Sequence, residues 1–293
     1  MLQAILWAVA GIVLLAFIVG TLALRRLYQV PRNRQAASPR RLKIPFSREK
    51  IPAGGRYQLA AWYFPAATTR APGAVLLHGW GQTAESLFPL VTPLHQAGLA
   101  TLLVDARNHG DSDAADRPSL RQFAEDMTFA LDWLAEKPEV DSERLFVLGH
   151  SIGGAAALLA GSGDPRVTGI ISISSFAHSV THLRRTLGGW HIPYWPLGWA
   201  LIHYKQARQG FSFDNVAPVN TVRDTAVPVL LIHARDDVVV PLSDAQTIYQ
   251  QRRDDRVRLL VLPEGGHYPL RALRRDSSAL TGFVDSCLHH AKS

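Results

Sequence analysis

Cysteine is nearly absent from this chain, whose 293 residues include a single one, Cys287. One thiol cannot form a disulfide within the chain, and no Cys/His spacing typical of a metal site occurs. The absence of disulfides is typical of proteins in a reducing compartment. We therefore expect neither a disulfide-stapled domain nor a metal centre, and we place Cys287 in a partly buried terminal helix.

Acidic residues are missing from the first 48 positions, although eight of the 31 Lys and Arg residues lie there. Beyond that point 23 basic residues face 24 acidic ones, so the excess behind the net charge of +7 is confined to the N-terminal segment. A nucleic-acid-binding protein usually carries its positive excess on the folded domain. The charge distribution therefore argues against a nucleic-acid partner.

Charge of either sign is missing from Ala4 to Leu24. This run is long enough to cross a hydrocarbon core of about 30 Å at about 1.5 Å per residue, and Trp7 and Tyr28 lie near its ends, where interface aromatics belong. A cleaved signal peptide would carry basic residues before a shorter apolar run, whereas here two arginines follow it. We therefore expect residues 1–25 to form an uncleaved, single-pass transmembrane anchor.

The basic residues after the anchor predict its orientation. Lys and Arg close to a membrane span stay on the cytoplasmic side, and here all of them lie C-terminal to the span. Residues 26–43, rich in arginine and proline, are expected to form an extended juxtamembrane linker. Each basic residue near anionic lipid would contribute about 1 kcal/mol to membrane binding. The folded domain, residues 44–293, is thus expected in the cytoplasm.

Apolar runs of strand length alternate with segments of helix length from residue 44 onward. Expected strands are 57–64, 74–78, 100–104, 145–148, 169–173, 227–233 and 257–262, and expected helices are 85–97, 120–136, 155–160, 243–252 and 271–289. This alternation predicts an α/β fold with a mostly parallel central sheet covered by helices on both faces. Residues 176–219 interrupt it with aromatic residues, Gly and Pro, which indicates an inserted cap.

The sequence Gly149-His150-Ser151-Ile152-Gly153 joins an expected strand to an expected helix. Gly-x-Ser-x-Gly in this setting is typical of a nucleophile elbow, in which side chains at the two glycine positions would crowd the backbone. The N-terminus of the following helix would direct its free N–H groups at developing negative charge. Ser151 is therefore the predicted nucleophile.

A serine nucleophile needs a base, and the base needs an acid that orients it. Polar loops follow two later strands, which is where open α/β sheets place their sites. The first contains Asp236 and Asp237, and the second contains His267 after two glycines. His267 is the predicted general base. Adjacent side chains diverge in an extended loop, and we favour Asp237 over Asp236 because it lies four residues before Pro241.

Two backbone N–H groups are expected to hold the oxyanion. One belongs to Ile152, directly after the nucleophile, and the other to Trp80 in the loop after the strand at 74–78. Among the remaining histidines, His150 is expected to point away from Ser151. His78 and His109 are expected to hold loops.

These motifs together resemble those of the α/β-hydrolase superfamily, in whose order they occur: His78 to Gly81, Asp105 to Ser112, Gly149 to Gly153, Asp237 to Pro241, and Gly266 to His267. The resemblance spans about residues 44 to 290. Within the superfamily, the resemblance is strongest to bacterial membrane-tethered esterases and to the Bem46-like branch, which has a similar N-terminal anchor. It implies a capped Ser-His-Asp hydrolase that acts through an acyl-enzyme and needs no cofactor. Ala234 departs from the pattern, since many members have glycine there.

The expected activity is hydrolysis of a carboxylic ester or thioester with an apolar acyl group, on a small-molecule or lipid-like substrate near the membrane. A serine peptidase of the same fold shares all the motifs. A catalytically silent membrane-tethered scaffold is a further alternative, disfavoured because a scaffold has no use for the complete set. A dehalogenase or epoxide hydrolase would carry a carboxylate at the position of Ser151.

Overall fold

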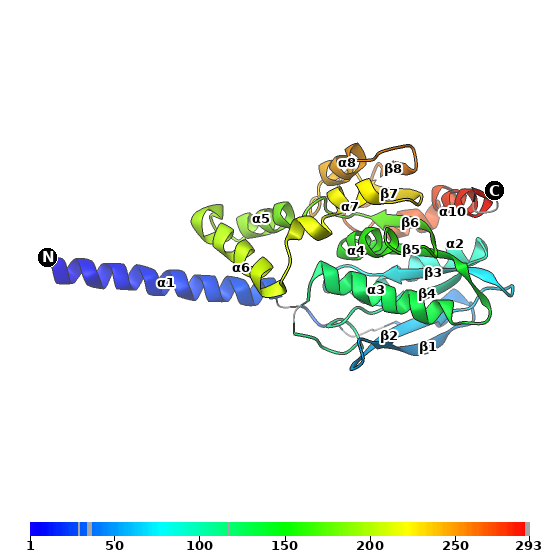
Figure 1. Cartoon of the computed structure of the whole chain (residues 1–293), viewed down its shortest axis with the longest axis horizontal. Coiled ribbons are helices and arrows are strands. Elements are labelled where there is room, and N and C mark those ends of the chain that lie inside the picture. Colours follow the sequence, from blue (N-terminus) through cyan, green and yellow to red (C-terminus); the bar gives the residue numbers. More distant parts are fainter. Residues whose placement is uncertain (29, 34–36, 117, 291–293) are drawn as a thin grey trace.

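Eight strands form one sheet in the computed structural model, which describes residues 1–28, 30–33, 37–116 and 118–290. Their order across the sheet is β1-β2-β4-β3-β5-β6-β7-β8 (Figure 1). The strands are β1 (Ser47–Ala53), β2 (Tyr57–Phe64), β3 (Ala71–Leu77), β4 (Ala100–Val104), β5 (Val140–His150), β6 (Val167–Ile173), β7 (Val229–Ala234) and β8 (Val257–Leu262). From β4 to β8 neighbouring strands are parallel, while β1–β2 and β2–β4 pair antiparallel.

The interior strands are apolar because both faces of the sheet are covered. In β3, Val75 and Leu77 belong to one core and Ala74 and Leu76 to the other, and all four are fully buried. Successive side chains of a strand point to opposite faces, so two buried faces require an uninterrupted apolar run. The predicted α/β fold with a mostly parallel sheet is confirmed.

Helices form one layer on each face of the sheet. One core includes side chains of α3 (Leu120–Ala135), α4 (Ile152–Gly161) and α8 (Leu242–Gln250). The opposite core includes side chains of α2 (Phe88–Gln96), α9 (Leu270–Arg275) and α10 (Ser278–His290). A short 3-10 helix, η2 (Ala84–Leu87), leads into α2. The sheet is thereby enclosed and its carboxyl edge is left for the loops that carry the polar motifs.

The aromatic-rich insert folds into short helices that bridge β6 and β7. They are α5 (Ser179–Gly189), a π-helical turn η3 (Tyr194–Gly198), α6 (Trp199–Gln209), η4 (Phe213–Val216) and α7 (Pro218–Asp224). A small core of its own, formed by Leu187, Leu201, Ile202 and Phe213, holds this insert together. It covers the sheet edge at which β5 and β6 end (Figure 1).

Two elements differ from the sequence expectation. The first strand, β1, was not expected, because Ser47–Ala53 is mostly polar and contains Pro52. It is an edge strand, with a neighbour on one side only, and edge strands tolerate proline and exposed polar side chains. The expected single helix at 271–289 is two helices. Asp276 adopts an extended conformation between them, and its carboxylate accepts the N–H of Ser278 at 3.1 Å.

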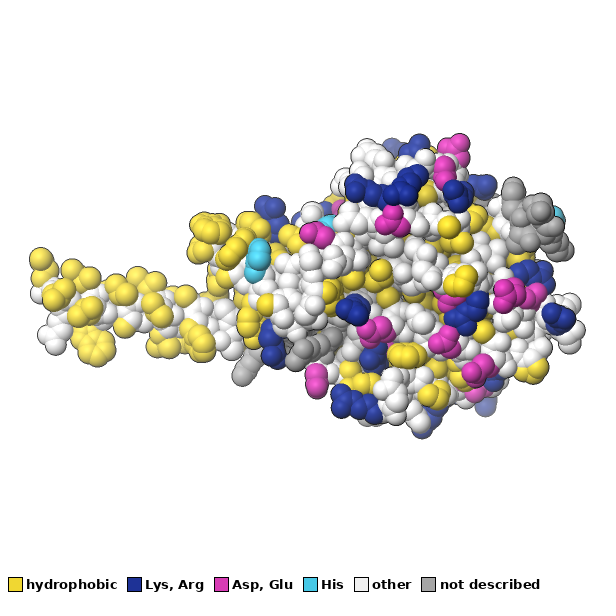
Figure 2. All heavy atoms as spheres, in the orientation of Figure 1, with side chains coloured by type: hydrophobic (Ala, Val, Ile, Leu, Met, Phe, Trp, Pro, Cys, Tyr) yellow, Lys and Arg dark blue, Asp and Glu magenta, His cyan; other side chains and the backbone are white. Residues whose placement is uncertain are grey.

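The N-terminal helix α1 (Leu2–Tyr28) projects from the body as a rod of exposed hydrophobic side chains (Figures 1 and 2). Residues Leu2–Leu22 have a mean hydropathy of 2.6 and none of them is buried, a length and composition that suit either a membrane span or a signal sequence. The helix continues past residue 25, the expected end of the anchor. The side chain of Tyr28, expected at the membrane interface, lies outside what the structure describes, as do the linker residues 29 and 34–36.

The described part of the linker contacts the body at several points. The guanidinium of Arg32 donates to the carbonyl of Ser112 at 2.5 Å, and the amide of Asn33 donates to the carbonyl of Gly81 at 2.8 Å. A 3-10 helix, η1 (Pro39–Leu42), follows. The expected extended linker is therefore docked along the domain and partly helical.

Candidate active site

Ser151 lies at the sharp turn between β5 and α4. Its backbone has φ 56° and ψ −120°, a conformation that costs a non-glycine residue about 1–3 kcal/mol and persists only where the surroundings hold it. The surroundings leave no room for side chains at the flanking glycines. A Cβ on Gly149 would lie 2.0 Å from the Gly153 carbonyl oxygen, and one on Gly153 would lie 2.2 Å from the Leu77 carbonyl oxygen. The close crossing of β3, β5 and α4 thus holds the strained turn.

Three side chains from distant loops form a hydrogen-bonded line at this turn. His267 Nε2 is 3.1 Å from Ser151 Oγ, and His267 Nδ1 is 2.8 Å from Asp237 Oδ2. A carboxylate only accepts hydrogen bonds, so Nδ1 carries the proton and Nε2 is left to accept from the serine hydroxyl. The structure brings together the three residues predicted as nucleophile, base and acid.

The carboxylate of Asp237 is buried, and each of its oxygens is engaged. Oδ1 accepts the backbone N–H groups of Val239 and Val240, each at 2.9 Å, while Oδ2 faces His267 and lies 3.4 Å from His233 Nε2. Burial raises the pKa of this carboxyl, but the hydrogen bonds from His233, His267 and Val240 outweigh burial and hold the pKa well below its ordinary value. Asp237 therefore stays ionised and fixed in place.

Asp236 points elsewhere and holds the neighbouring loop. Its carboxylate accepts the backbone N–H of Gly266 at 2.8 Å and that of Gly265 at 3.4 Å. Gly265 and Gly266 have positive φ values, 143° and 57° respectively, which residues with a Cβ rarely adopt. The adjacent acids thus have separate tasks: Asp237 contacts the His267 ring, and Asp236 fixes the backbone that leads to it.

His150 turns away from Ser151 and supports His267 from the other side. Its Nε2 donates to the His267 carbonyl oxygen at 2.6 Å, and its ring centroid lies 4.9 Å from that of His267. Burial lowers the pKa of His150 to about 3, with the neighbouring His267 adding to the effect. The ring is therefore neutral at ordinary pH and does not compete for the serine proton.

The loop that contains Trp80 runs beside the nucleophile. A Cβ on Gly79 would lie 3.3 Å from Ser151 Cβ, so the backbone before Trp80 approaches Ser151 closely. Ile152 is the first residue of α4, where backbone N–H groups have no acceptor within the helix. Trp80, Ser151 and Ile152 line one cavity.

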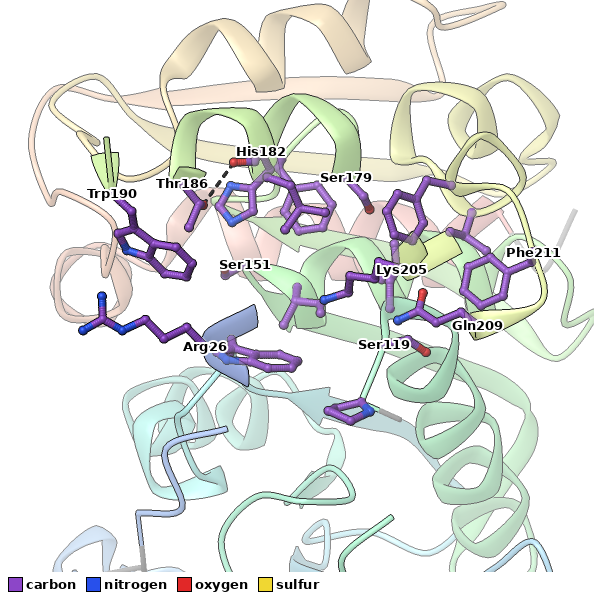
Figure 3. A pocket seen from close by; sticks show the side chains of 18 residues that line it. Arg26, Ser119, Ser151, Ser179, His182, Thr186, Trp190, Lys205, Gln209 and Phe211 are labelled. Carbon is purple, nitrogen blue, oxygen red and sulfur yellow. Dashed lines mark hydrogen bonds between the residues drawn. The ribbon is translucent and has the colours of Figure 1, made fainter. Parts of the chain in front are cut away.

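This cavity has a volume of about 270 Å³ and lies between the cap and the turn at Ser151 (Figure 3). Its wall is mostly apolar and includes five aromatic side chains, those of Trp80, Phe176, Trp190, Phe211 and Phe213. It can hold an apolar group bound to Ser151. No group of three or more His, Cys, Asp or Glu is arranged to bind a metal ion in the part of the chain that the structure describes.

Sequence reasoning did not find several residues that shape the site. His233 lies near the end of β7 and beside Asp237; the only sequence signal is a polar residue near the end of an apolar strand. Lys205 and Gln209 lie one helical turn apart on α6 and line the cavity, as does Arg26 at the end of α1. The insert lacks clear helical periodicity, and the approach of α1 to the cap brings together residues far apart in sequence, so neither contribution could be predicted.

Comparison with known proteins agrees with the fold and the class of enzyme. Residues 72–206 match a family model described as serine aminopeptidase, S33, a stretch that includes Ser151 but ends before Asp237. The uncharacterized protein YfhR of Escherichia coli (strain K12) is 27% identical over 232 residues, covering 76% of this chain and 74% of YfhR.

Solved structures extend the similarity over most of the chain. An esterase of Pyrococcus furiosus, Pf2001, has a TM-score of 0.69 at 21% identity, covering 89% of this chain and 98% of the esterase. The α/β hydrolase GrgF from Penicillium sp. sh18 has a TM-score of 0.65 at 21% identity, covering 84% of this chain and 99% of GrgF. These structures show that the protein has the α/β-hydrolase fold, and the family match over residues 72–206 identifies it as a hydrolase.

Proposed function

We propose that this protein is a membrane-anchored serine esterase that cleaves carboxylic esters or thioesters with an apolar acyl group. The observation that carries the proposal is the hydrogen-bonded line from Asp237 through His267 to Ser151, which ends at the wall of an aromatic cavity. Serine, imidazole and carboxylate in this order supply a nucleophile, its base and the group that orients the base.

In the first half of the reaction Ser151 Oγ attacks the substrate carbonyl carbon while His267 Nε2 takes the hydroxyl proton. The imidazolium that forms is stabilised by the ionised Asp237, and the collapse of the tetrahedral intermediate expels the alcohol or thiol, which receives the proton from His267. An acyl-enzyme remains on Ser151. In the second half His267 activates a water that attacks the acyl carbon, and the carboxylic acid leaves as Ser151 regains its proton.

The oxyanion of each intermediate is proposed to accept hydrogen bonds from the backbone N–H groups of Trp80 and Ile152. Two observations support this role for the N–H groups: Ile152 lies at the start of α4, and the Gly79–Trp80 backbone closely approaches Ser151. Loss of one such donor typically costs about 10²–10³ in rate. The aromatic wall of the cavity supports an apolar acyl group.

The domain organisation follows the same proposal, with residues 1–25 as anchor, 26–43 as linker and 44–293 as the hydrolase domain with its cap at about 176–219. The long apolar surface of α1, none of which is buried over Leu2–Leu22, supports insertion in a membrane, because such a surface is costly in water. The basic residues after the span support a cytoplasmic body. A lipid-like ester would then be met at the membrane surface.

Labelling with a fluorophosphonate probe and turnover of p-nitrophenyl esters test the esterase proposal. Wild-type protein should label and hydrolyse the esters, whereas Ser151→Ala should not label and should lose on the order of 10⁶-fold in kcat. The thermal unfolding midpoint of the variant serves as the control for folding. Folded wild-type protein that neither labels nor hydrolyses any ester would instead support a silent scaffold.

A serine peptidase is the second candidate, favoured by the description of the matching family model. The two activities differ in leaving group, since a peptidase must protonate a departing amine. Assaying aminoacyl p-nitroanilides beside the p-nitrophenyl esters separates them. A kcat/KM for the anilides equal to or above that for the esters would replace the esterase proposal.

A further inference from the structure

The cap cavity has a cationic interior. Lys205 on α6 and Arg26 at the end of α1 both line it, and no Asp or Glu is among its described lining residues. Lys205 is 8% exposed, and a lysine this buried keeps its charge only where polar or charged groups contact it. A purely hydrocarbon acyl group could not form a hydrogen bond or an ion pair with these cationic side chains.

The amine of Lys205 points into the cavity toward Ser151, and Gln209 lies beside it (Figure 3). Both amide atoms of Gln209 are buried and have no hydrogen-bond partner among the residues described. An unpaired buried amide costs free energy that a bound polar group would recover. An ammonium group has three N–H donors, so it can bind a ligand oxygen in addition to any contact within the protein.

The cavity wall has an apolar part and a polar part. Trp80 and Phe176 belong to the apolar part, whereas Lys205 and Gln209 of α6 form a polar site on the cap side. Arg26 adds a second cation at the mouth, where its guanidinium lies 5.8 Å from the Trp190 ring centroid. An ester whose carbonyl lies at Ser151 would place an attached group against Lys205.

We propose that the substrate is an anionic amphiphile: an ester whose part inside the cap cavity is apolar near the scissile bond and carries a carboxylate or phosphate that binds Lys205 and Gln209. This proposal rests on the proposed esterase function and specifies its substrate class. The negative charge would be supplied either by the acyl group or by the alcohol, and the position of the anion in a test ester distinguishes the two.

Matched chromogenic esters test the proposal. For an acyl-side anion, mono-p-nitrophenyl glutarate is compared with the neutral p-nitrophenyl pentanoate; for an alcohol-side anion, 4-acetoxybenzoate is compared with 4-acetoxyacetophenone. After the spontaneous rates are subtracted, the ratio of kcat/KM for anionic over neutral ester should exceed one in at least one pair. Lys205→Met should lower that ratio about 10- to 100-fold, and Lys205→Arg should restore part of it.

The exposed Lys50→Met is the matched control and should leave the ratio unchanged. Gln209→Leu should lower the ratio less than Lys205→Met, because it removes polar atoms and no charge. Neutral preference in both pairs, or equal losses on anionic and neutral esters in Lys205→Met, would overturn the anionic substrate class and leave the esterase proposal standing. Failure of the wild type on all four esters would instead count against the esterase proposal itself.

Discussion

At the scale of single residues, the adjacent carboxylates Asp236 and Asp237 show how backbone geometry separates two similar side chains. Asp237 accepts a hydrogen bond from His267 Nδ1. Asp236 accepts the backbone N–H groups of Gly265 and Gly266, which precede His267 in the sequence. An ionised partner at Nδ1 both selects the reactive tautomer and stabilises the imidazolium, and only Asp237 is positioned for this.

Asp237→Asn should therefore lower kcat by about 10³–10⁴-fold, because the amide can donate to Nδ1 and favours the wrong tautomer. Asp236→Asn should stay within about tenfold of the wild type, since its amide oxygen still accepts the backbone N–H of Gly266 and the His267 ring keeps its own carboxylate partner. Steady-state hydrolysis of one p-nitrophenyl ester by both variants provides the comparison. A large loss confined to Asp236→Asn would reassign the acid.

Residues of the site differed in how readily the sequence revealed them. Ser151 and His267 stand in short motifs at fixed places relative to strands, and motifs of this kind are local. His233 and Lys205 have no motif, and their importance arises from burial beside Asp237 and inside the cavity. Burial of a polar side chain depends on packing between distant segments, which periodicity alone does not describe.

At the scale of elements, the junction of β5 and α4 depends on backbone approach more than on side chains. A Cβ on Gly153 would collide with the backbone of β3, whereas the ideal Cβ of Gly163, just after α4, meets nothing within 4 Å. These two glycines lie near opposite ends of one helix, so the same substitution at Gly163 is a matched control for a substitution at Gly153.

Gly153→Ala should destabilise the protein by about 3 kcal/mol or more, because a backbone carbonyl cannot move aside as a flexible side chain can. Gly163→Ala should change the free energy of unfolding by less than about 0.5 kcal/mol. Urea unfolding followed by circular dichroism measures both. Similar stability of the two variants would show that the crossing is looser than its geometry indicates.

Elements were also predicted unequally well. The interior strands were found because burial on both faces requires continuous apolar runs. The strand β1 was missed because an edge strand needs no such run, and the break at Asp276 was missed because a helical pattern continues on both sides of it.

At the scale of the whole molecule, four histidines with lowered pKa values tie stability to pH. Burial is the main cause that lowers the pKa of His78 and His182 to about 4 and of His109 and His150 to about 3. In the unfolded chain these imidazoles bind protons near pH 6.5, which the folded state does not do until well below that pH. The folded state is thus penalised as pH falls through the unfolded value.

The contribution of these histidines to the free energy of unfolding should accordingly be constant above about pH 7. Between about pH 6.5 and 4 the free energy of unfolding should fall, by up to about 1.4 kcal/mol per pH unit for each histidine. Denaturant titrations at closely spaced pH values check this. In the variant His109→Asn the free energy of unfolding should fall less steeply with decreasing pH than in the wild type. A free energy of unfolding that does not change from pH 7 to 4.5 would contradict the prediction.

The exposed helix α1 predicts the behaviour of the full chain in cells. The protein should remain in the membrane fraction after alkaline carbonate extraction, and the hydrolase body should resist protease added to intact spheroplasts until they are lysed. Release by carbonate would argue against a span, and degradation before lysis would reverse the proposed orientation.

The sequence by itself determined the class of fold, the nucleophile motif and the apolar N-terminal segment, because each depends on local pattern: strand and helix periodicity, glycines around a turn, and a long uncharged run. Only the tertiary structure decided which acid reaches His267, how the cap forms a cavity over Ser151, and where Lys205, Gln209 and Arg26 direct their polar atoms. These features depend on contacts between segments far apart in the sequence, such as that of the Arg26 guanidinium with the Trp190 ring. Contacts of this kind follow from the packing of elements through shape and charge, which local sequence pattern does not describe.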